Sequence, residues 1–153
     1  MRIRKATMDD IDLLIKIRLD YIHADWGSVP EETDKAVRSR FHDYLTGHLA
    51  SGDFAGMLAV EGETVMGAAY LVINEKPANP VYPNGITGLI LNVLTYPEYR
   101  RRGIATRLIE AIIDEARQAG ASCLELSATE EGKPLYEKMG FTEARCPAMR
   151  LKI

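Results

Sequence analysis

The sequence has few cysteines, no excess of positive charge and no long apolar run. Its two cysteines, Cys123 and Cys146, have no cysteine or histidine neighbours at zinc-ligand spacing, so we expect reduced, mainly structural thiols and no metal centre. The net charge is -3, whereas a general nucleic-acid-binding protein is normally basic. The N-terminus lacks an apolar signal region, and no apolar run approaches the roughly 20 residues that span a bilayer. We therefore expect a cytoplasmic protein that contacts neither nucleic acid nor membrane.

The composition is that of an ordinary globular domain. Hydrophobic residues make up 46% of the 153 residues and charged residues 27%. This length suits one domain with a substantial core. The chain contains no internal repeat, low-complexity tract or long linker, so we predict a single domain over residues 1–153.

Apolar periodicity predicts an alternation of strands and helices along the chain. The predicted strands are residues 3–6, 57–60, 65–73, 86–96, 122–128 and 141–153. The predicted helices are residues 7–24, 34–49, 104–119 and 130–140. On the first helix, Arg18 shares a face with apolar residues, namely Ile11, Leu14, Ile15, Leu19 and Ile22. The run from residue 86 to residue 128 is a βαβ unit with parallel strands, so the order as a whole predicts a mixed α/β sheet.

A basic turn stands between the strand that ends near Tyr96 and the long helix that follows. Three arginines, residues 100–102, precede Gly103. A helix N-terminus carries free N–H groups and partial positive charge, and Gly103 has no Cβ to block a phosphate ligand. Neither a Walker A sequence nor G-x-G-x-x-G occurs, which argues against nucleoside triphosphates and NAD. The residues alone would also fit a solvated basic turn that binds no ligand.

Two motifs resemble those of the GNAT superfamily of N-acetyltransferases. Residues 100–105 (RRRGIA) resemble its R/Q-x-x-G-x-G/A signature, and residues 135–141 (LYEKMGF) resemble its closing L-Y-x-x-x-G-F motif. The order of elements also agrees over essentially the whole chain. The resemblance implies a GNAT-like α/β fold, with a mixed central sheet of about six to seven strands and helices on both faces. A splayed pair of parallel strands would hold coenzyme A.

The resemblance implies that acetyl-CoA is the cofactor. The signature loop would bind its pyrophosphate, mainly through backbone amides, and a bulged strand before the loop would pair with the pantetheine arm. Thr129 stands where many members have an asparagine that touches the cofactor. The implied cofactor-binding residues are Val93, Leu94, Thr95, Arg100, Arg101, Arg102, Gly103, Ile104, Ala105, Thr106 and Thr129.

Tyr136 matches the motif tyrosine, which the resemblance implies protonates the departing CoA thiolate. A phenol has a pKa near 10 and is protonated at neutral pH, although Tyr136 would also fit a packed aromatic of its helix. A general base is harder to find, because Asn92 on the central strand cannot be one. Deprotonation of the amine through water is an equal alternative. No motif supports any of the remaining candidate bases, which are His23, Asp25, Glu31, Glu32 and Glu98.

The acceptor pocket is expected near the first two helices and the loop before the central strand. Trp26, Tyr82 and Asn92 are the candidate acceptor-binding residues, although Trp26 would also fit a core residue over the first helix. His42 and His48 are expected on a helix surface.

The implied activity is direct transfer of an acetyl group from acetyl-CoA to a primary amine of a small molecule or peptide, and a homodimer is plausible. Two alternatives stay open. The chain would also fit an acyl-CoA-binding sensor or scaffold domain without turnover. Nucleic-acid binding through the arginines predicts salt-sensitive affinity for DNA.

Overall fold

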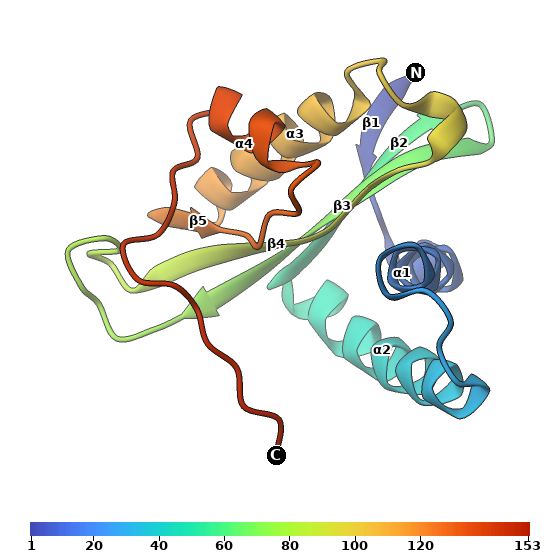
Figure 1. Ribbon diagram of the computed structural model, residues 1–153, viewed down its shortest axis with the longest axis horizontal. Helices are drawn as coiled ribbons and strands as arrows, with labels where there is room; N and C mark the ends of the chain where they lie inside the picture. The colour runs from blue at the N-terminus through green and yellow to red at the C-terminus, as the bar shows by residue number, and fades with distance from the viewer.

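The computed structural model describes residues 1–153, which contain one five-stranded mixed sheet with strand order β1-β2-β3-β4-β5 (Figure 1). Its strands are β1 (Arg2–Lys5), β2 (Phe54–Glu61), β3 (Thr64–Glu75), β4 (Ile86–Thr95) and β5 (Cys123–Glu125). Neighbouring strands are antiparallel except for β4 and β5, which are parallel. The predicted mixed α/β sheet and its βαβ unit are confirmed, with five strands instead of about six to seven.

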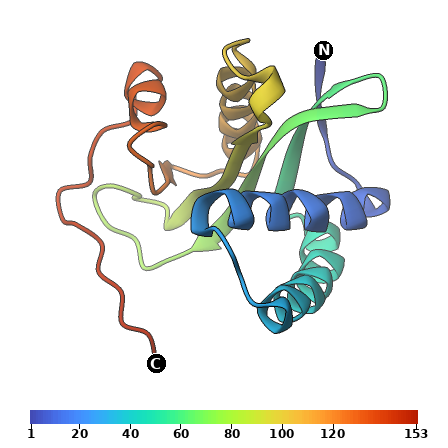
Figure 2. The same cartoon turned by 45° about the vertical axis from the view of Figure 1, so that its right-hand side comes forward.

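Helices cover both faces of this sheet, as predicted. Figures 1 and 2 show α1 and α2 on one face and α3 and α4 on the other. The helices are α1 (Ile11–Trp26), α2 (Glu31–Ser51), α3 (Ile104–Gln118) and α4 (Lys133–Lys138), with short 3-10 helices at Met8–Asp10 and Pro97–Tyr99. No helix among them combines the length and apolar character needed to cross a membrane.

The sheet separates two apolar clusters, because its central strands are buried on both faces. Tyr70 of β3 belongs to the cluster under α1 and α2, together with Leu14 and Leu45. Its neighbour Leu71 belongs to the cluster under α3, together with Leu108. Alternation along a strand sends successive side chains to opposite faces, so one strand contributes to both clusters.

The predicted last strand is wrong. Residues 141–153 form no strand, and Met149, Leu151 and Ile153 are exposed. These apolar residues alternate with Arg150 and Lys152, which is a strand-like pattern, but a strand also needs a partner. β5 offers only a three-residue edge instead of the predicted residues 122–128, and Pro147 has no N–H to donate to a ladder.

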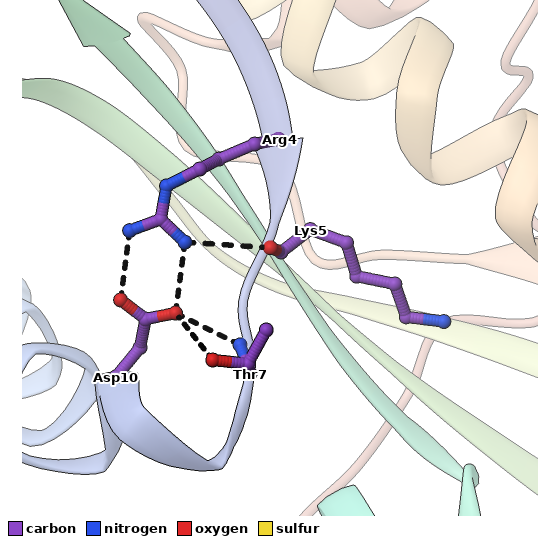
Figure 3. A network of polar contacts seen from close by, with 4 residues as sticks. All are labelled: Arg4, Lys5, Thr7 and Asp10. Atoms are coloured by element: carbon purple, nitrogen blue, oxygen red, sulfur yellow. Dashed lines mark hydrogen bonds and ion pairs between the residues drawn. The ribbon is translucent and has the colours of Figure 1, made fainter.

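A bidentate ion pair joins β1 to the start of α1 (Figure 3). The guanidinium of Arg4 donates to both carboxylate oxygens of Asp10, at 2.8 and 2.7 Å. The backbone N–H of Thr7 donates to the same carboxylate at 2.8 Å. Asp10 thus closes a capping box at the helix start that the sequence placed at Thr7. These contacts, led by the one to Arg4, lower the pKa of Asp10 from 3.8 to about 2.

The ion pair should make stability depend on pH. Because the pKa of Asp10 is lowered on folding, its contribution is complete above the unfolded pKa and is lost as pH falls through about 2. We expect Asp10→Asn to reduce the free energy of unfolding by about 1 to 2 kcal/mol at neutral pH. The difference from the original chain should shrink below pH 4 in urea titrations. Asp9→Asn changes a neighbouring exposed carboxylate and is the control; a difference that persists at pH 2 would contradict this account.

Candidate active site

The parallel strands β4 and β5 pair over only a short length and then diverge. Their register covers Thr87 to Leu89 of β4, opposite Cys123 to Glu125 of β5. From Ile90 to Thr95 this edge of β4 has no strand partner, although the other edge pairs with β3. Free N–H and C=O groups on such an edge can bind an extended amide chain as an added strand. The predicted splayed strand pair is therefore present.

A β-bulge at Asn92 accompanies the divergence. Tyr70 of β3 pairs with Leu91 and Ala68 pairs with Leu94, so two residues of β4 lie opposite one residue of β3. Asn92 has a φ of 54°, a left-handed conformation that asparagine adopts more readily than most residues. The bulge re-aims the side chain of Asn92, which contacts Arg18 of α1. The bulge that the resemblance implied is thus seen.

The turn between β4 and α3 exposes a run of unpaired backbone donors. No N–H group from Arg101 to Thr106 donates a hydrogen bond within the protein, and no side chain caps α3. Gly103, the N-cap residue, has a φ of 71°. A Cβ placed on Gly103 would meet no atom within 4 Å, so the space in front of it is open. Geometry, free donors and helix dipole together suit a pyrophosphate group.

The arginine side chains of this turn are exposed, and two of them contact neighbouring backbone carbonyl groups. Arg100 donates from Nε to the carbonyl oxygen of Thr95 at 3.3 Å. Arg102 donates to the carbonyl oxygen of Glu98 at 3.2 Å, and its guanidinium lies over the ring of Tyr99. Arg101 makes no hydrogen bond or ion pair, and all three arginines are exposed. The backbone therefore forms the cradle, and the arginines add charge around it.

Tyr136 of α4 packs against the apolar cluster under α3, to which Val93 of β4 and Leu124 of β5 also contribute. Its ring packs edge-on against Phe141, with centroids 5.9 Å apart. Burial, and secondarily the neighbouring Tyr21 of α1, raises the pKa of Tyr136 above 10.0. The hydroxyl makes no hydrogen bond within the protein, so a packed ring carries a free, protonated phenol. Its phenol is thus available as a proton donor at neutral pH.

An open groove of about 680 Å³ lies between α3 and α4. Thr106, in the first turn of α3, is at its edge, so the groove adjoins the run of free N–H groups. Thr129 precedes α4, and its hydroxyl accepts the N–H of Gly132 at 3.1 Å. The Thr129 hydroxyl therefore stabilises the turn that leads into α4, whose N-cap residue is Gly132.

The three candidate acceptor residues differ in their surroundings. Trp26 is 72% exposed at the end of α1, so its interpretation as a core residue is wrong. Tyr82 is half-buried in the loop before β4, where the ammonium of Lys76 lies 5.3 Å from its ring centre. Asn92 is buried in the bulge. No hydrogen bond or ring contact joins these side chains.

The candidate bases are occupied elsewhere or exposed. His23 bonds Asp34 of α2 at 2.8 Å. Glu31 pairs with Lys35 at 2.7 Å. The remaining candidates lie exposed on the surface and are Asp25, Glu32 and Glu98.

One of the two helix-surface histidines is placed differently from the prediction. His42 is exposed, as expected. His48 is half-buried, stacks on Tyr44 with ring centres 4.0 Å apart, and bonds Asp53 at 2.8 Å. The pairing with Asp53 lies just beyond the end of α2, where helix periodicity gives no guidance.

Two polar contacts of α1, one to the bulge in β4 and one to the residue after β4, were not predicted from the sequence. Arg18 of α1 donates to the side-chain oxygen of Asn92 at 3.4 Å. The Tyr96 hydroxyl donates to Asp20 at 2.5 Å, which ties the end of β4 to the same helix. An arginine on an apolar helix face indicates a buried polar contact, and Arg18 gave this signal. Its partner could not be predicted, because Asn92 lies on β4, far away in the sequence.

Comparison with known proteins identifies the same family that the two sequence motifs resemble. The model of the acetyltransferase (GNAT) family matches residues 17–141. A search of curated proteins gave no match. A GCN5-related N-acetyltransferase from Ralstonia eutropha JMP134 is 28% identical, with a TM-score of 0.83 over 98% of this chain and 97% of that chain. A predicted acetyltransferase from Clostridium acetobutylicum, solved with acetyl-CoA, is 29% identical, with a TM-score of 0.86 over 99% of this chain and 95% of that chain.

A more distant structure shares the fold alone. Glucosamine-6-phosphate N-acetyltransferase from Arabidopsis thaliana is 19% identical, with a TM-score of 0.69 over 98% of this chain and 97% of that chain.

Proposed function

Because the chain belongs to the GNAT acetyltransferase family, with acetyl-CoA as cofactor, we propose that residues 1–153 act as one domain that transfers an acetyl group to a primary amine. The amine belongs to a small molecule or a peptide. The observation that carries this proposal is the run of free N–H groups from Arg101 to Thr106 at the end of the diverging strand β4. Tyr136, whose hydroxyl makes no hydrogen bond within the protein, packs against the same apolar cluster as Val93 of β4.

The chain's own residues would hold the cofactor at two places. The free amides from Arg101 to Thr106 would bind its pyrophosphate, in the open space in front of Gly103. The backbone from Val93 to Thr95 would pair with the pantetheine arm along the unpaired edge of β4. The side chains of Val93 and Leu94 pack into the core, which leaves backbone groups for this pairing. Acetyl-CoA, when bound, supplies an activated thioester acyl group.

Tyr136 would donate the proton that the departing thiolate takes up. Its raised pKa keeps the phenol protonated throughout the neutral range. Its packing against Phe141 would fix the ring, while the hydroxyl stays free. His23 is paired with Asp34 and Glu31 with Lys35, and the other candidate bases are exposed on the surface, so the amine would lose its proton through water.

A CoA-binding sensor or scaffold domain without turnover is the second candidate function. Two features favour it: no side chain is placed as a general base, and the hydroxyl of Thr129 is engaged in the turn before α4. The free hydroxyl of Tyr136 favours the enzyme.

The two candidates differ in turnover. Purified protein would be mixed with acetyl-CoA and a panel of small amines, polyamines, amino acids and peptides, and free thiol release would be followed. Amine-dependent release above the rate of hydrolysis is expected. Acetyl-CoA binding without release from any amine would reject the enzyme and favour the sensor. Salt-sensitive DNA binding without acetyl-CoA binding would instead support a nucleic-acid role. Light scattering of the same sample would test the homodimer.

A further inference from the structure

Arg18 is a half-buried arginine without a counter-ion. It lies on α1 between Leu14, which is fully buried under the sheet, and Tyr21, which neighbours Tyr136. Its only hydrogen bond is the long one, 3.4 Å, from Nη1 to the side-chain oxygen of Asn92. No carboxylate lies within 4 Å of the guanidinium, in contrast to Arg4 with Asp10. A partly buried charge of this kind is costly unless an opposite charge joins it.

Asn92 presents a second unmet donor beside this guanidinium. Asn92 is only 3% exposed, and its side-chain amide nitrogen makes no hydrogen bond. The left-handed backbone at the bulge aims this amide toward α1 instead of into the sheet ladder. Buried donors are rarely left without a partner, so an unpaired amide next to an unpaired cation indicates a missing acceptor of hydrogen bonds.

The acidic residues of α1 do not supply that acceptor. Asp20 already binds Lys16 and the hydroxyl of Tyr96, each at 2.5 Å. Asp25 is exposed near the end of the helix and forms no ion pair. The neighbours of Arg18 are otherwise phenols, those of Tyr21 and Tyr70, and the latter is bonded to the carbonyl oxygen of Leu14. The charge of Arg18 thus stays unbalanced within the chain.

We infer that Arg18 and Asn92 bind a carboxylate of the acceptor, which makes the acceptor an amino acid or a similar amine that carries a carboxylate. This inference rests on the proposed function. A guanidinium and an amide offer several N–H groups from two sides, a set that suits a carboxylate. The anionic groups of CoA belong at the other end of β4, at the free amides from Arg101 to Thr106, and the thioester end carries no anion. The anion at the bulge therefore comes from the acceptor.

The test compares acceptors that differ only in the carboxylate. Each amino acid of a panel is paired with its amide, in which the carboxylate is replaced by a neutral group of similar size. We expect kcat/KM for the best amino acid to exceed that for its amide by about 10- to 100-fold, the effect of a hydrogen bond to a charged group. Amides acetylated as well as their acids would overturn the inference and leave the acetyltransferase intact. Acetyl-CoA binding without turnover of any amine would overturn both.

Two variants locate the effect. Arg18→Met keeps the length of the side chain without its charge, and Asn92→Asp keeps the shape and tolerates the left-handed backbone while it places a competing carboxylate beside Arg18. In each variant, the ratio of kcat/KM for acid over amide should fall to about threefold or less, mainly through KM for the acid. Arg38→Met removes an exposed, unpaired arginine of α2 and should keep the ratio. A ratio unchanged in Asn92→Asp, in protein that melts at the original temperature, would contradict the inference even if Arg18→Met does not fold.

Discussion

Replacement of Gly103 by glutamate is expected to raise the Kd for acetyl-CoA by about 100-fold or more. The space in front of Gly103 is open, and unpaired N–H groups surround it. A glutamate side chain would fill that space and place a negative charge where the pyrophosphate belongs. Isothermal titration calorimetry with acetyl-CoA measures the change directly.

The control for this variant separates backbone strain from loss of binding. Gly103 has a φ of 71°, and Gly52, at the end of α2, has a φ of 81° with equally open surroundings. Both glutamate variants should lose about 1 kcal/mol of stability, because a side chain is strained in the left-handed region. Only the change at Gly103 should weaken acetyl-CoA binding. An unchanged Kd for Gly103→Glu would reject the turn as the pyrophosphate site.

Replacement of Tyr136 by phenylalanine is expected to lower kcat by about 10- to 100-fold, while the Kd for acetyl-CoA changes by less than about threefold. The phenylalanine keeps the edge-on packing against Phe141, and the lost hydroxyl makes no hydrogen bond within the protein. Stability should therefore change little. The measurement is the steady-state rate of thiol release with the best amine of the panel.

Tyr44→Phe is the matched control for this substitution. Tyr44 also packs among aromatic rings and also has a raised pKa because of burial, but it lies on α2. Its loss of a hydroxyl should leave kcat unchanged. An equal kcat for Tyr136→Phe and the original chain would assign Tyr136 a packing role alone.

The pH dependence of kcat provides a second check on Tyr136. The acid form of the phenol is the useful one, and burial raises its pKa above 10.0. Loss of the proton from Tyr136 should therefore not reduce kcat below about pH 10. An alkaline fall in kcat near pH 8 that disappears in Tyr136→Phe would contradict this assignment.

The turn and its helix were predictable because their signals are local. A short run of residues, from Arg100 to Ala105, specifies a tight turn, a missing Cβ and a helix start. The βαβ unit followed in the same way from strand and helix periodicity. Only the resemblance implied a bulge in β4, and its position at Asn92 was not predicted, since nothing in the apolar strand indicates a left-handed residue.

The contacts that complete the candidate site could not be predicted from local patterns. Arg18 and Asn92 are 74 residues apart and meet only because α1 packs over the bulged strand. Tyr21 and Tyr136 lie on helices that cover opposite faces of the sheet. The last strand was predicted wrongly because alternation is a local pattern. A strand also depends on a partner strand, and β5 is too short to provide one.

A crystal structure of the chain with acetyl-CoA tests the central claim most directly. The pyrophosphate should accept hydrogen bonds from backbone N–H groups between Arg101 and Thr106. The pantetheine arm should run along β4 from Thr95 toward Asn92, on the edge that β5 leaves free, and the thioester sulfur should lie near the hydroxyl of Tyr136. A cofactor bound elsewhere, with its phosphates away from Gly103 and the edge of β4 unoccupied, would contradict the account.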